Sequence, residues 1–328
     1  MARKKIIIIL IIVFIVISSL FIYFISPLNT NKKMLLKIKS GDTFHKVSYI
    51  LWKNRIIKSR SFFLFLVKIS GNSSKLKEGI YNISSNMSLF KIMDTLTTGN
   101  VVTKSFTIPE GYNIYQIADL LDKKGLGQKE EFLRLVHSKK IIKKYNINST
   151  SLEGYLYPDT YTVPVGISLN DIINLMVKNF FIKVTPLMRE RIKEKGYTLQ
   201  KAIKLASLVE WEARYDFERP IITAVFLNRL KRGLNLASCA TVLYAIGHHK
   251  KRLFYKDLKT NSLYNTYIYK GLPPTPICNP GKNSILAVIF PAKVNYLYFV
   301  SMKNGRHFFS TTYSQHLKAY KKYILNKE

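Results

Sequence analysis

The chain contains, at residues 199–213, the stretch Leu199-Gln-Lys-Ala-Ile-Lys-Leu-Ala-Ser-Leu-Val-Glu-Trp-Glu-Ala213, which predicts a helix. At about 100° per residue, Ile203, Ala206 and Glu210 fall on one narrow face of that helix. The face is apolar except for the carboxylate. Glu212 points to the opposite side, where the pattern predicts that it is solvated. One of the two glutamates therefore stands where a core residue is expected.

The glutamate on the apolar face has two interpretations. Burial disfavours the charged form of a carboxyl, and a carboxyl that stays protonated near neutral pH is a good general acid. Glu210 is therefore a candidate catalytic residue. The alternative is a structural ion pair with an arginine such as Arg214, Arg219 or Arg229, since structural pairs also place carboxylates in apolar surroundings.

Composition limits the classes of protein. The 328 residues are 47% hydrophobic, which suffices for two compact domains and argues against disorder. The formal net charge of +33 favours an anionic partner, although the lysines are scattered along the chain as biased composition alone would place them. Two cysteines, Cys239 and Cys278, form neither a disulfide framework nor a metal site. We expect two buried free thiols, with one disulfide as the alternative, and neither metal nor cofactor.

The N-terminal region predicts a membrane anchor. Residues 6–25 are an uncharged, strongly apolar run that is long enough to cross a bilayer as a helix. Arg3, Lys4 and Lys5 precede this run, so residues 1–5 are expected in the cytoplasm. The long run without a small-residue cleavage site favours an uncleaved anchor. Residues from 26 onward would then lie outside the membrane, which argues against nucleic acid and favours lipid headgroups or cell-wall polymer as partners.

Two segment pairs after the anchor show internal similarity. Residues 41–51 align without gaps with residues 111–121, and residues 81–89 align with residues 161–169. Each copy predicts a short strand, a turn, a capping Ser, Thr or Asn, and an amphipathic helix. Such strand-turn-helix units resemble the LysM module, which binds glycans containing N-acetylglucosamine. The alternative for the membrane-proximal region, residues 26–104, is a set of packing units without a ligand.

Dense motifs follow along the rest of the chain. They are Leu152–Tyr161, Leu205–Glu210, Glu218–Leu230, Thr241–Tyr244, Tyr264–Tyr267, Gly271–Pro274 and Pro291–Val300. Together they resemble the MltG (YceG-like) family of endolytic murein transglycosylases. The resemblance implies an α+β protein of the bacterial inner membrane with an extracytoplasmic catalytic domain at residues 105–328. It also implies cleavage of nascent peptidoglycan strands, termination of their elongation, and proximity to penicillin-binding synthases. The family's catalytic glutamate matches Glu210.

The implied reaction breaks the MurNAc–GlcNAc β-1,4 bond without water. The muramyl C6 hydroxyl attacks its own anomeric carbon and leaves a 1,6-anhydro end, so one carboxyl can act first as acid and then as base. A hydrolytic muramidase would usually need two carboxylates at a defined separation. A non-catalytic peptidoglycan-binding scaffold is the alternative from another functional class.

Other residues of the motifs are candidates for substrate binding. They are Glu153, Tyr155, Tyr157, Asp159, Glu218, Asn228, Arg229, Thr241, Asn265, Thr266 and Tyr267. Alternation predicts that the tyrosines and Asp159 line one side of an extended segment. Asn228 contacts a sugar acetamido group, orients Glu210 or bonds the backbone. Arg229 binds either a muramyl-peptide carboxylate or a structural acid. Cys239 and Ala237 occupy positions where the family often has Asp and Gln.

Overall fold

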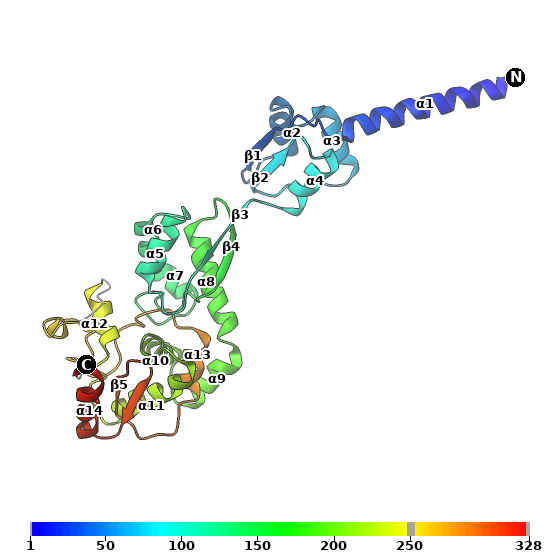
Figure 1. Cartoon of the computed structure of the whole chain (residues 1–328). Coiled ribbons are helices and arrows are strands. Elements are labelled where there is room, and N and C mark those ends of the chain that lie inside the picture. The colour runs from blue at the N-terminus through cyan, green and yellow to red at the C-terminus, as the bar shows by residue number, and fades with distance from the viewer. Residues whose placement is uncertain (1, 248–252, 326–328) are drawn as a thin grey trace. The chain divides into compact units, whose positions relative to one another are not determined.

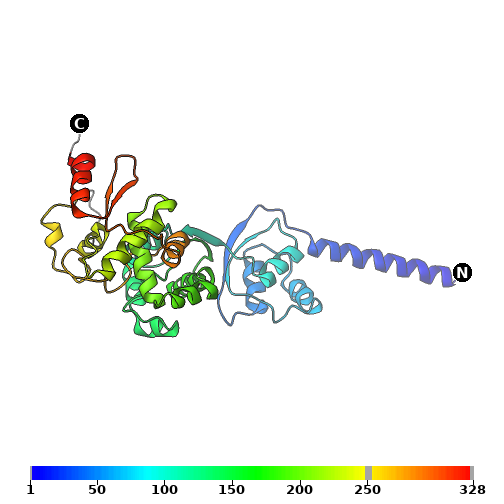
Figure 2. The same ribbon diagram turned by 90° about the horizontal axis from the view of Figure 1, so that it is seen from below.

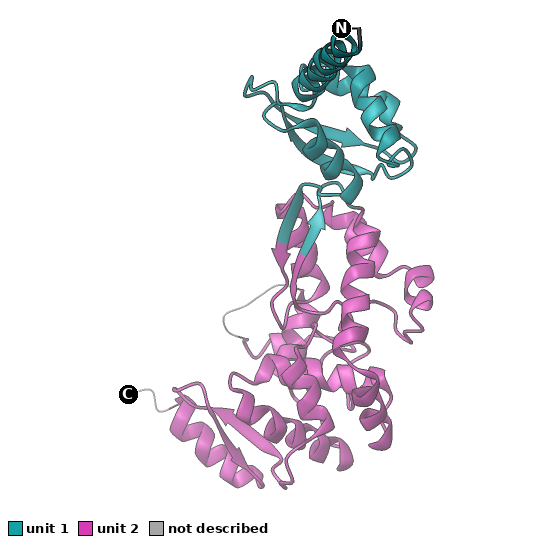
Figure 3. Cartoon of the chain, turned by 90° about the vertical axis from the view of Figure 1, so that its right-hand side faces the viewer, with its two compact units in different colours: residues 1–105, 162–167 teal, residues 106–161, 168–328 magenta. Residues whose placement is uncertain are grey.

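The computed structural model describes residues 2–247 and 253–325, which form two compact units. Unit 1 comprises residues 1–105 and 162–167, and unit 2 comprises residues 106–161 and 168–328 (Figure 3). Residues 162–167 belong to unit 1 because β4 (Thr160–Pro164) pairs with β3 (Thr103–Thr107). The sequence-based division at residues 104/105 assigns that segment to the catalytic domain instead.

Unit 1 contains one long projecting helix and a small α+β body. Its elements are α1 (Ala2–Ile25), β1 (Lys33–Ile38), α2 (Phe44–Lys53), α3 (Arg60–Ile69), β2 (Gly79–Ser84) and α4 (Leu89–Thr98). The strands β1 and β2 pair antiparallel, with Leu36 opposite Tyr81. Both residues are buried in a core that also contains Phe63 and Ile92. Alternating burial along each strand leaves one face of this sheet for the helices to cover.

The helix α1 extends away from the rest of unit 1 in both views (Figures 1 and 2). An 18-residue stretch within residues 3–25 has a mean hydropathy of 3.3, and none of its residues is fully buried in the protein. Near its end, Phe21 and Phe24 lie with ring centroids 5.6 and 5.0 Å from Phe62 of α3. A helix of this length and composition is compatible with a single-pass membrane anchor.

The similar segments form similar local structures. Thr43, Ser88, Asn113 and Ser168 each precede a helix, and each side chain accepts a hydrogen bond from the backbone N–H three residues later. These caps satisfy one of the free donors at each helix start. The strand-turn-capped-helix prediction is therefore confirmed, whereas the identity of these units as LysM-like glycan binders stays a prediction.

Unit 2 is mostly helical. Its elements, in addition to the shared ends of β3 and β4, are α5 (Ile114–Lys123), α6 (Lys129–Val136), α7 (Lys139–Lys144), α8 (Leu169–Lys183), α9 (Pro186–Glu194), α10 (Leu199–Glu212), the 3₁₀ turn η1 (Asp216–Glu218), α11 (Arg219–Lys231), α12 (Cys239–Ile246), the 3₁₀ turn η2 (Asp257–Lys259), α13 (Lys282–Ile289), β5 (Tyr298–Ser301), β6 (His307–Ser310), α14 (Tyr313–Tyr320) and the π-helical turn η3 (Lys321–Leu325). The predicted mixed α+β class is confirmed.

The helix α10 is the central element of unit 2. It contacts α9, α11, α12 and α13, and the segment 202–209 is buried except for the half-buried Lys204. A helix that is apolar on nearly all sides is a core helix and not a surface helix with one apolar stripe. The expectation of a solvated face carrying Glu212 is therefore wrong in part, since Lys201 on that side is exposed but Lys204 and Glu212 are half-buried.

Candidate active site

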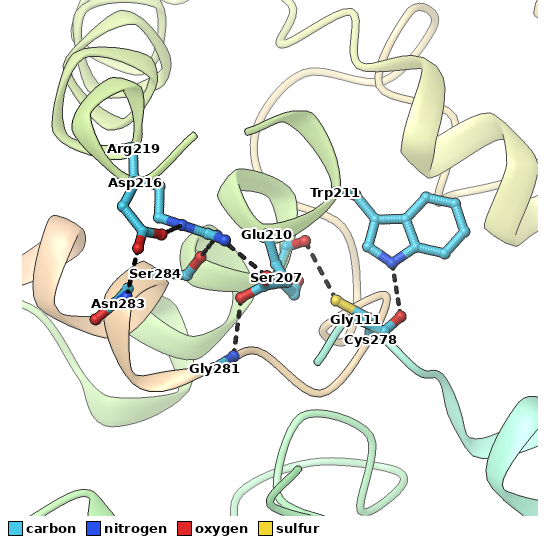
Figure 4. A network of polar contacts seen from close by, with 10 residues as sticks. All are labelled: Gly111, Ser207, Glu210, Trp211, Asp216, Arg219, Cys278, Gly281, Asn283 and Ser284. Atoms are coloured by element: carbon cyan, nitrogen blue, oxygen red, sulfur yellow. Dashed lines mark hydrogen bonds and ion pairs between the residues drawn. The ribbon is translucent and has the colours of Figure 1, made fainter. Parts of the chain in front are cut away.

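Glu210 lies in a buried ion pair (Figure 4). Nη1 of Arg219, in the first turn of α11, donates to Oε1 of Glu210 over 3.1 Å, and the backbone N–H of Gly281 donates to Oε2 over 2.8 Å. The two side chains are only 6% and 9% exposed. Arg219 also donates to Asp216 and to Ser284 of α13. The structure thus contains the ion pair that the sequence offered as the alternative, and this pair joins α10, α11 and the N-terminus of α13.

A second carboxyl, which the sequence does not single out, lies beside this pair. A Cβ placed on Gly281 would fall 1.9 Å from Oε1 of Glu110, so the tip of Glu110 rests against the same glycine that binds Glu210. The residue Glu110 as a whole is exposed to solvent, but its carboxyl group is partly desolvated. This desolvation and the charge of Glu210 raise the pKa of Glu110. Trp211 fixes the adjacent turn by donating Nε1–H to the carbonyl of Gly111 over 2.8 Å.

Glu212 lies on another side of α10 and lines a cavity of about 460 Å³. Its Oε1 accepts a hydrogen bond of 2.5 Å from the hydroxyl of Ser238. Burial raises the pKa of the Glu212 carboxyl, while the Ser238 hydrogen bond and the nearby His307 act in the opposite direction. Its place at the last position of α10 also disfavours the anion, because the helix C-terminus carries partial negative charge.

The cavity has a largely aromatic wall from the C-terminal part of the chain. Tyr298 and Phe299 come from β5, Tyr313, His316 and Tyr320 come from α14, and the other lining residues are Glu212, Arg229, Leu236, Ala237, Cys239, Tyr267, Val300, Ser301, His307 and Ile324. Aromatic faces with a few polar groups suit the binding of a sugar chain. Of the predicted site residues, the structure brings Arg229 and Tyr267 into this cavity.

Glu218 and His307 form a carboxylate–imidazole pair behind the cavity. Oε1 of Glu218 accepts from the backbone N–H of His307 over 2.8 Å, and Oε2 lies 2.9 Å from Nδ1 of its ring. Both side chains are almost fully buried. Glu218 thus fixes the orientation of the imidazole, and within the described residues the other ring nitrogen has no protein partner. Such pairing is the usual way in which a functional imidazole is held in one orientation.

Thr241, Asn265 and Thr266 support the segment that carries Ser238. Oγ1 of Thr266 accepts from the backbone N–H of Ser238 over 3.1 Å and lies 2.9 Å from Oγ1 of Thr241. Asn265 donates to the carbonyls of Leu258 and Thr260 and so holds its own loop in place. These three residues are buried and position Ser238 without reaching the cavity themselves.

Cys239 and Tyr267 form a contact at the cavity wall, where Sγ lies 3.1 Å from the phenolic oxygen. The structure confirms that both cysteines are free. The expectation that both are buried is wrong for Cys239, which is exposed, and right for Cys278. The residue that departs from the common family pattern therefore faces the cavity.

Glu153 is fully buried in a separate hydrogen-bond network. It accepts hydrogen bonds from the backbone N–H of Ile114, the hydroxyl of Tyr244 and the amide of Asn279, over 3.0 to 3.1 Å. Burial raises its pKa to about 8, against the effect of these donors. Glu153 therefore connects α5, α12 and the loop before α13, and it does not line the Glu212 cavity.

Asn228 has a structural environment. Its side-chain amide donates to the carbonyls of Val294 and Tyr296 over 2.8 and 3.0 Å. This arrangement matches the backbone-bonding alternative, and it holds the segment before β5 against α11.

The predicted row of tyrosines and one carboxylate shares one side, but that side packs against α8 and does not form an open sugar-binding face. Tyr155, Tyr157 and Tyr161 are buried, Tyr155 packs edge-on against Phe180, and Tyr161 donates to the carbonyl of Tyr157. Asp159 is bound by Asn179 and Lys183. The alternation of the sequence reflects burial in the core of unit 2, because the large rings stabilise the protein by packing.

The fold and site define a mixed α+β protein in which a buried carboxyl meets an aromatic cavity. The chain belongs to the YceG-like family, whose model matches residues 36–322. It is 35% identical to the endolytic murein transglycosylase of Bacillus subtilis, over 95% of this chain and 92% of that protein. It is also 29% identical to the endolytic murein transglycosylase of Streptococcus pneumoniae strain D39, over 88% of this chain but only 58% of that longer protein. The crystal structure of a yceG-like protein from Listeria monocytogenes is 34% identical, with a TM-score of 0.62, and the match covers 88% of this chain and 100% of that one.

Proposed function

We propose that this protein is an endolytic peptidoglycan lytic transglycosylase in which Glu212 is the acid and base. The observation that carries the proposal is a carboxyl whose pKa is raised by burial and which lines the aromatic cavity. A general acid must hold its proton near the working pH and must be able to reach the substrate. The names of the relatives supply the substrate class and the type of reaction.

The geometry supports Glu212 in this role more strongly than Glu210. Both carboxylate oxygens of Glu210 already accept donors from the protein, namely Arg219 and the backbone of Gly281. Glu210 does not line the cavity, whereas Glu212 does. The catalytic role predicted for Glu210 from the family resemblance stays a prediction, and the two glutamates can be tested as a matched pair because they lie on one helix.

In the proposed reaction, Glu212 gives its proton to the glycosidic oxygen of the leaving GlcNAc as the bond to the muramyl anomeric carbon breaks. The resulting carboxylate then takes the proton of the muramyl C6 hydroxyl, and O6 forms a bond to that carbon. The products are a free 4-hydroxyl on GlcNAc and a 1,6-anhydroMurNAc end, and the carboxyl is protonated again. Ser238 and His307 would stabilise the transient carboxylate by a hydrogen bond and by charge.

The proposal includes the topology of the protein. The helix α1 would anchor the chain with residues 1–5 in the cytoplasm, and both units would lie on the outer side of the cytoplasmic membrane. The membrane-proximal, LysM-like region would contact glycan, and penicillin-binding synthases would be neighbours. In this position the protein would meet nascent strands and end their elongation.

The test compares Glu212→Gln with Glu210→Gln in the full chain, in detergent, on purified peptidoglycan. We expect that Glu212→Gln remains folded and loses at least about 100-fold in the release of 1,6-anhydromuropeptides, because the proton donor is gone. Glu210→Gln should keep activity in its folded fraction. The opposite result would return the catalytic role to Glu210.

The same digestion separates the alternative functions. In water enriched in oxygen-18, a transglycosylase gives anhydro ends without the label, whereas a hydrolytic muramidase incorporates it at the new reducing end. Binding to peptidoglycan without any cleavage by the wild-type protein would identify a scaffold.

A further inference from the structure

Arg229 is a cation without an acidic partner at the wall of the Glu212 cavity. Its Nε donates to the carbonyl of Asn235 over 2.7 Å, and its Nη1 donates to the carbonyl of Leu297 over 3.0 Å. Among residues 2–247 and 253–325, no carboxylate lies within ion-pair distance of this guanidinium. The structural acid that the sequence allowed for Arg229 is therefore absent from this part of the chain.

The surroundings of Arg229 leave its charge uncompensated. The guanidinium lies 5.3 Å from the ring centroid of Tyr298, and His316 stacks on the same tyrosine with centroids 5.3 Å apart. Nδ1 of His316 is buried and has no hydrogen-bond partner. Burial and the charge of Arg229 lower the pKa of His316, so this imidazole stays neutral near pH 7. A half-buried cation and a histidine with an unpaired buried nitrogen thus line one cavity.

We propose that Arg229 and His316 form an anion subsite that binds a carboxylate carried by the muramyl substituent of the glycan. This inference rests on the proposed function, since it assigns a part of the same cavity. A guanidinium binds a carboxylate through parallel N–H donors, and the remaining N–H groups of Arg229 have no protein acceptor among the described residues. GlcNAc carries no such acid, so the subsite distinguishes the two alternating sugars.

The anion subsite would determine which glycosidic bond of the strand is placed at Glu212. In an alternating strand, a sugar chain that slides by one residue would present the GlcNAc–MurNAc bond to Glu212 instead of the MurNAc–GlcNAc bond. A carboxylate held at Arg229 fixes the muramyl residue on one side of Glu212, because both residues line the same cavity. The carboxylate has two possible sources, namely the free lactyl group of a peptide-stripped strand or an acid of the attached stem peptide.

The first experiment measures binding, which does not depend on cleavage. The probes are N-acetylmuramic acid, its lactyl methylamide and N-acetylglucosamine, titrated into full-length Glu212→Gln protein in detergent. We expect at least about tenfold tighter binding of the acid than of the methylamide, which is the usual range for a charge-assisted hydrogen-bonded pair. Equal binding of the acid and the methylamide would exclude the lactyl carboxylate, and it would overturn the proposal if peptide-bearing strands also bind no more tightly than stripped strands.

Two variants link the preference to Arg229. In Arg229→Met the ratio of acid to methylamide affinity should fall to about one, and in Arg229→Lys it should fall only in part, because the charge remains and the planar donor fork is lost. An unchanged ratio in Arg229→Met would overturn the proposal. A ratio is used because Arg229 also holds two carbonyls, so its loss can weaken all binding by disturbing the wall.

A third measurement covers the case in which Arg229→Met does not fold. In otherwise unchanged protein with isotope-labelled histidine, N-acetylmuramic acid should raise the pKa of His316, because the bound carboxylate offsets the charge of Arg229. N-acetylglucosamine should not change it. No change with N-acetylmuramic acid, and none with a muramyl peptide that carries a stem acid, would overturn the proposal.

Binding of peptidoglycan strands with and without stem peptides distinguishes the two sources of the carboxylate. It also tests the anion subsite independently of the transglycosylase activity. Tighter binding of peptide-stripped strands than of their methylamidated form assigns the lactyl acid, and a preference only for peptide-bearing strands assigns the stem peptide. Absence of anhydro products from the wild-type enzyme would refute the transglycosylase assignment while the binding ratios still test the subsite.

Discussion

The hydroxyl of Ser238 donates to Oε1 of Glu212 over 2.5 Å and joins the start of α12 to the end of α10. Ser238 is held in turn by Thr266, whose hydroxyl accepts its backbone N–H. The hydrogen bond favours the ionised form of Glu212, whereas burial favours the protonated form. The proton affinity of the proposed catalytic acid is therefore set by a contact between segments that are distant in sequence.

Ser238→Ala should move the alkaline limb of the pH–activity profile upward. Removing the hydroxyl removes a donor that stabilises the carboxylate, so the pKa of Glu212 rises further and the acid form persists to higher pH. A hydrogen bond to a charged group corresponds to about one pH unit. Profiles of kcat/KM on soluble peptidoglycan strands test this. A downward shift, or none, would contradict the assignment of Glu212 as the acid.

Arg219→Met should destabilise the protein by about 3 to 5 kcal/mol, because it leaves Glu210 as a buried carboxylate without its cation. The matched control is Arg191→Met, which removes an exposed i,i+3 pair with Glu194 and should cost less than about 0.5 kcal/mol. Urea unfolding of both variants measures the difference. Equal effects would show that the Glu210 pair adds no more to stability than a surface pair.

Glu153→Gln should flatten the dependence of stability on pH. The pKa of Glu153 is about 8 in the folded protein and near the ordinary 4.5 in the unfolded chain. Between these values the folded state holds the proton more tightly, so stability falls as pH rises from 4.5 to 8, by at most about 1.4 kcal/mol per unit, and then levels off.

Glutamine does not titrate, so the Glu153 contribution to that slope disappears in the variant. Urea unfolding midpoints at pH 5, 6, 7 and 8 provide the measurement, and the same substitution at the exposed Glu190 is the control. A variant that retains the slope of the wild-type protein would show that other groups cause it.

Cys239 should react with a maleimide in the native protein, and Cys278 only after unfolding, because Cys239 is an exposed residue whose sulfur is only partly covered, whereas Cys278 is fully buried. Burial around the sulfur raises the pKa of Cys239, so its labelling should be slow at neutral pH and faster at pH 8 to 9. With a membrane-impermeant reagent on intact cells, labelling of Cys239 would support the outward orientation. Cys239→Ser is the control, and labelling only after lysis would place unit 2 in the cytoplasm.

Local structure was largely predictable from the sequence. The helix at residues 199–213 exists as α10, and the repeated segments form capped helices after short strands. Caps and periodicity act over a few residues, so their signals lie next to one another in the chain. The apolar run of α1 is visible for the same reason.

The candidate site was predictable only in part. Periodicity placed Glu210 on an apolar face but left its partner open, and the structure supplies Arg219. Periodicity predicted wrongly that Glu212 is solvated, because a helical wheel assumes one buried side. The helix α10 instead contacts four other helices. One signal in the sequence could have corrected this prediction. Small and apolar residues lie around nearly the whole circumference of the segment 202–209, which indicates a core helix.

The sequence by itself determined the anchor-like helix, the capped secondary structure, the family and the presence of two glutamates at the end of α10. Only the tertiary structure decided which glutamate meets a cavity and which is held by an ion pair. The deciding contacts join residues 26 positions apart for Ser238 and Glu212, 71 for Gly281 and Glu210, and 89 for His307 and Glu218. The proton affinity and accessibility of a carboxyl depend on the groups packed around it in space, and no local pattern specifies which distant segments those groups come from.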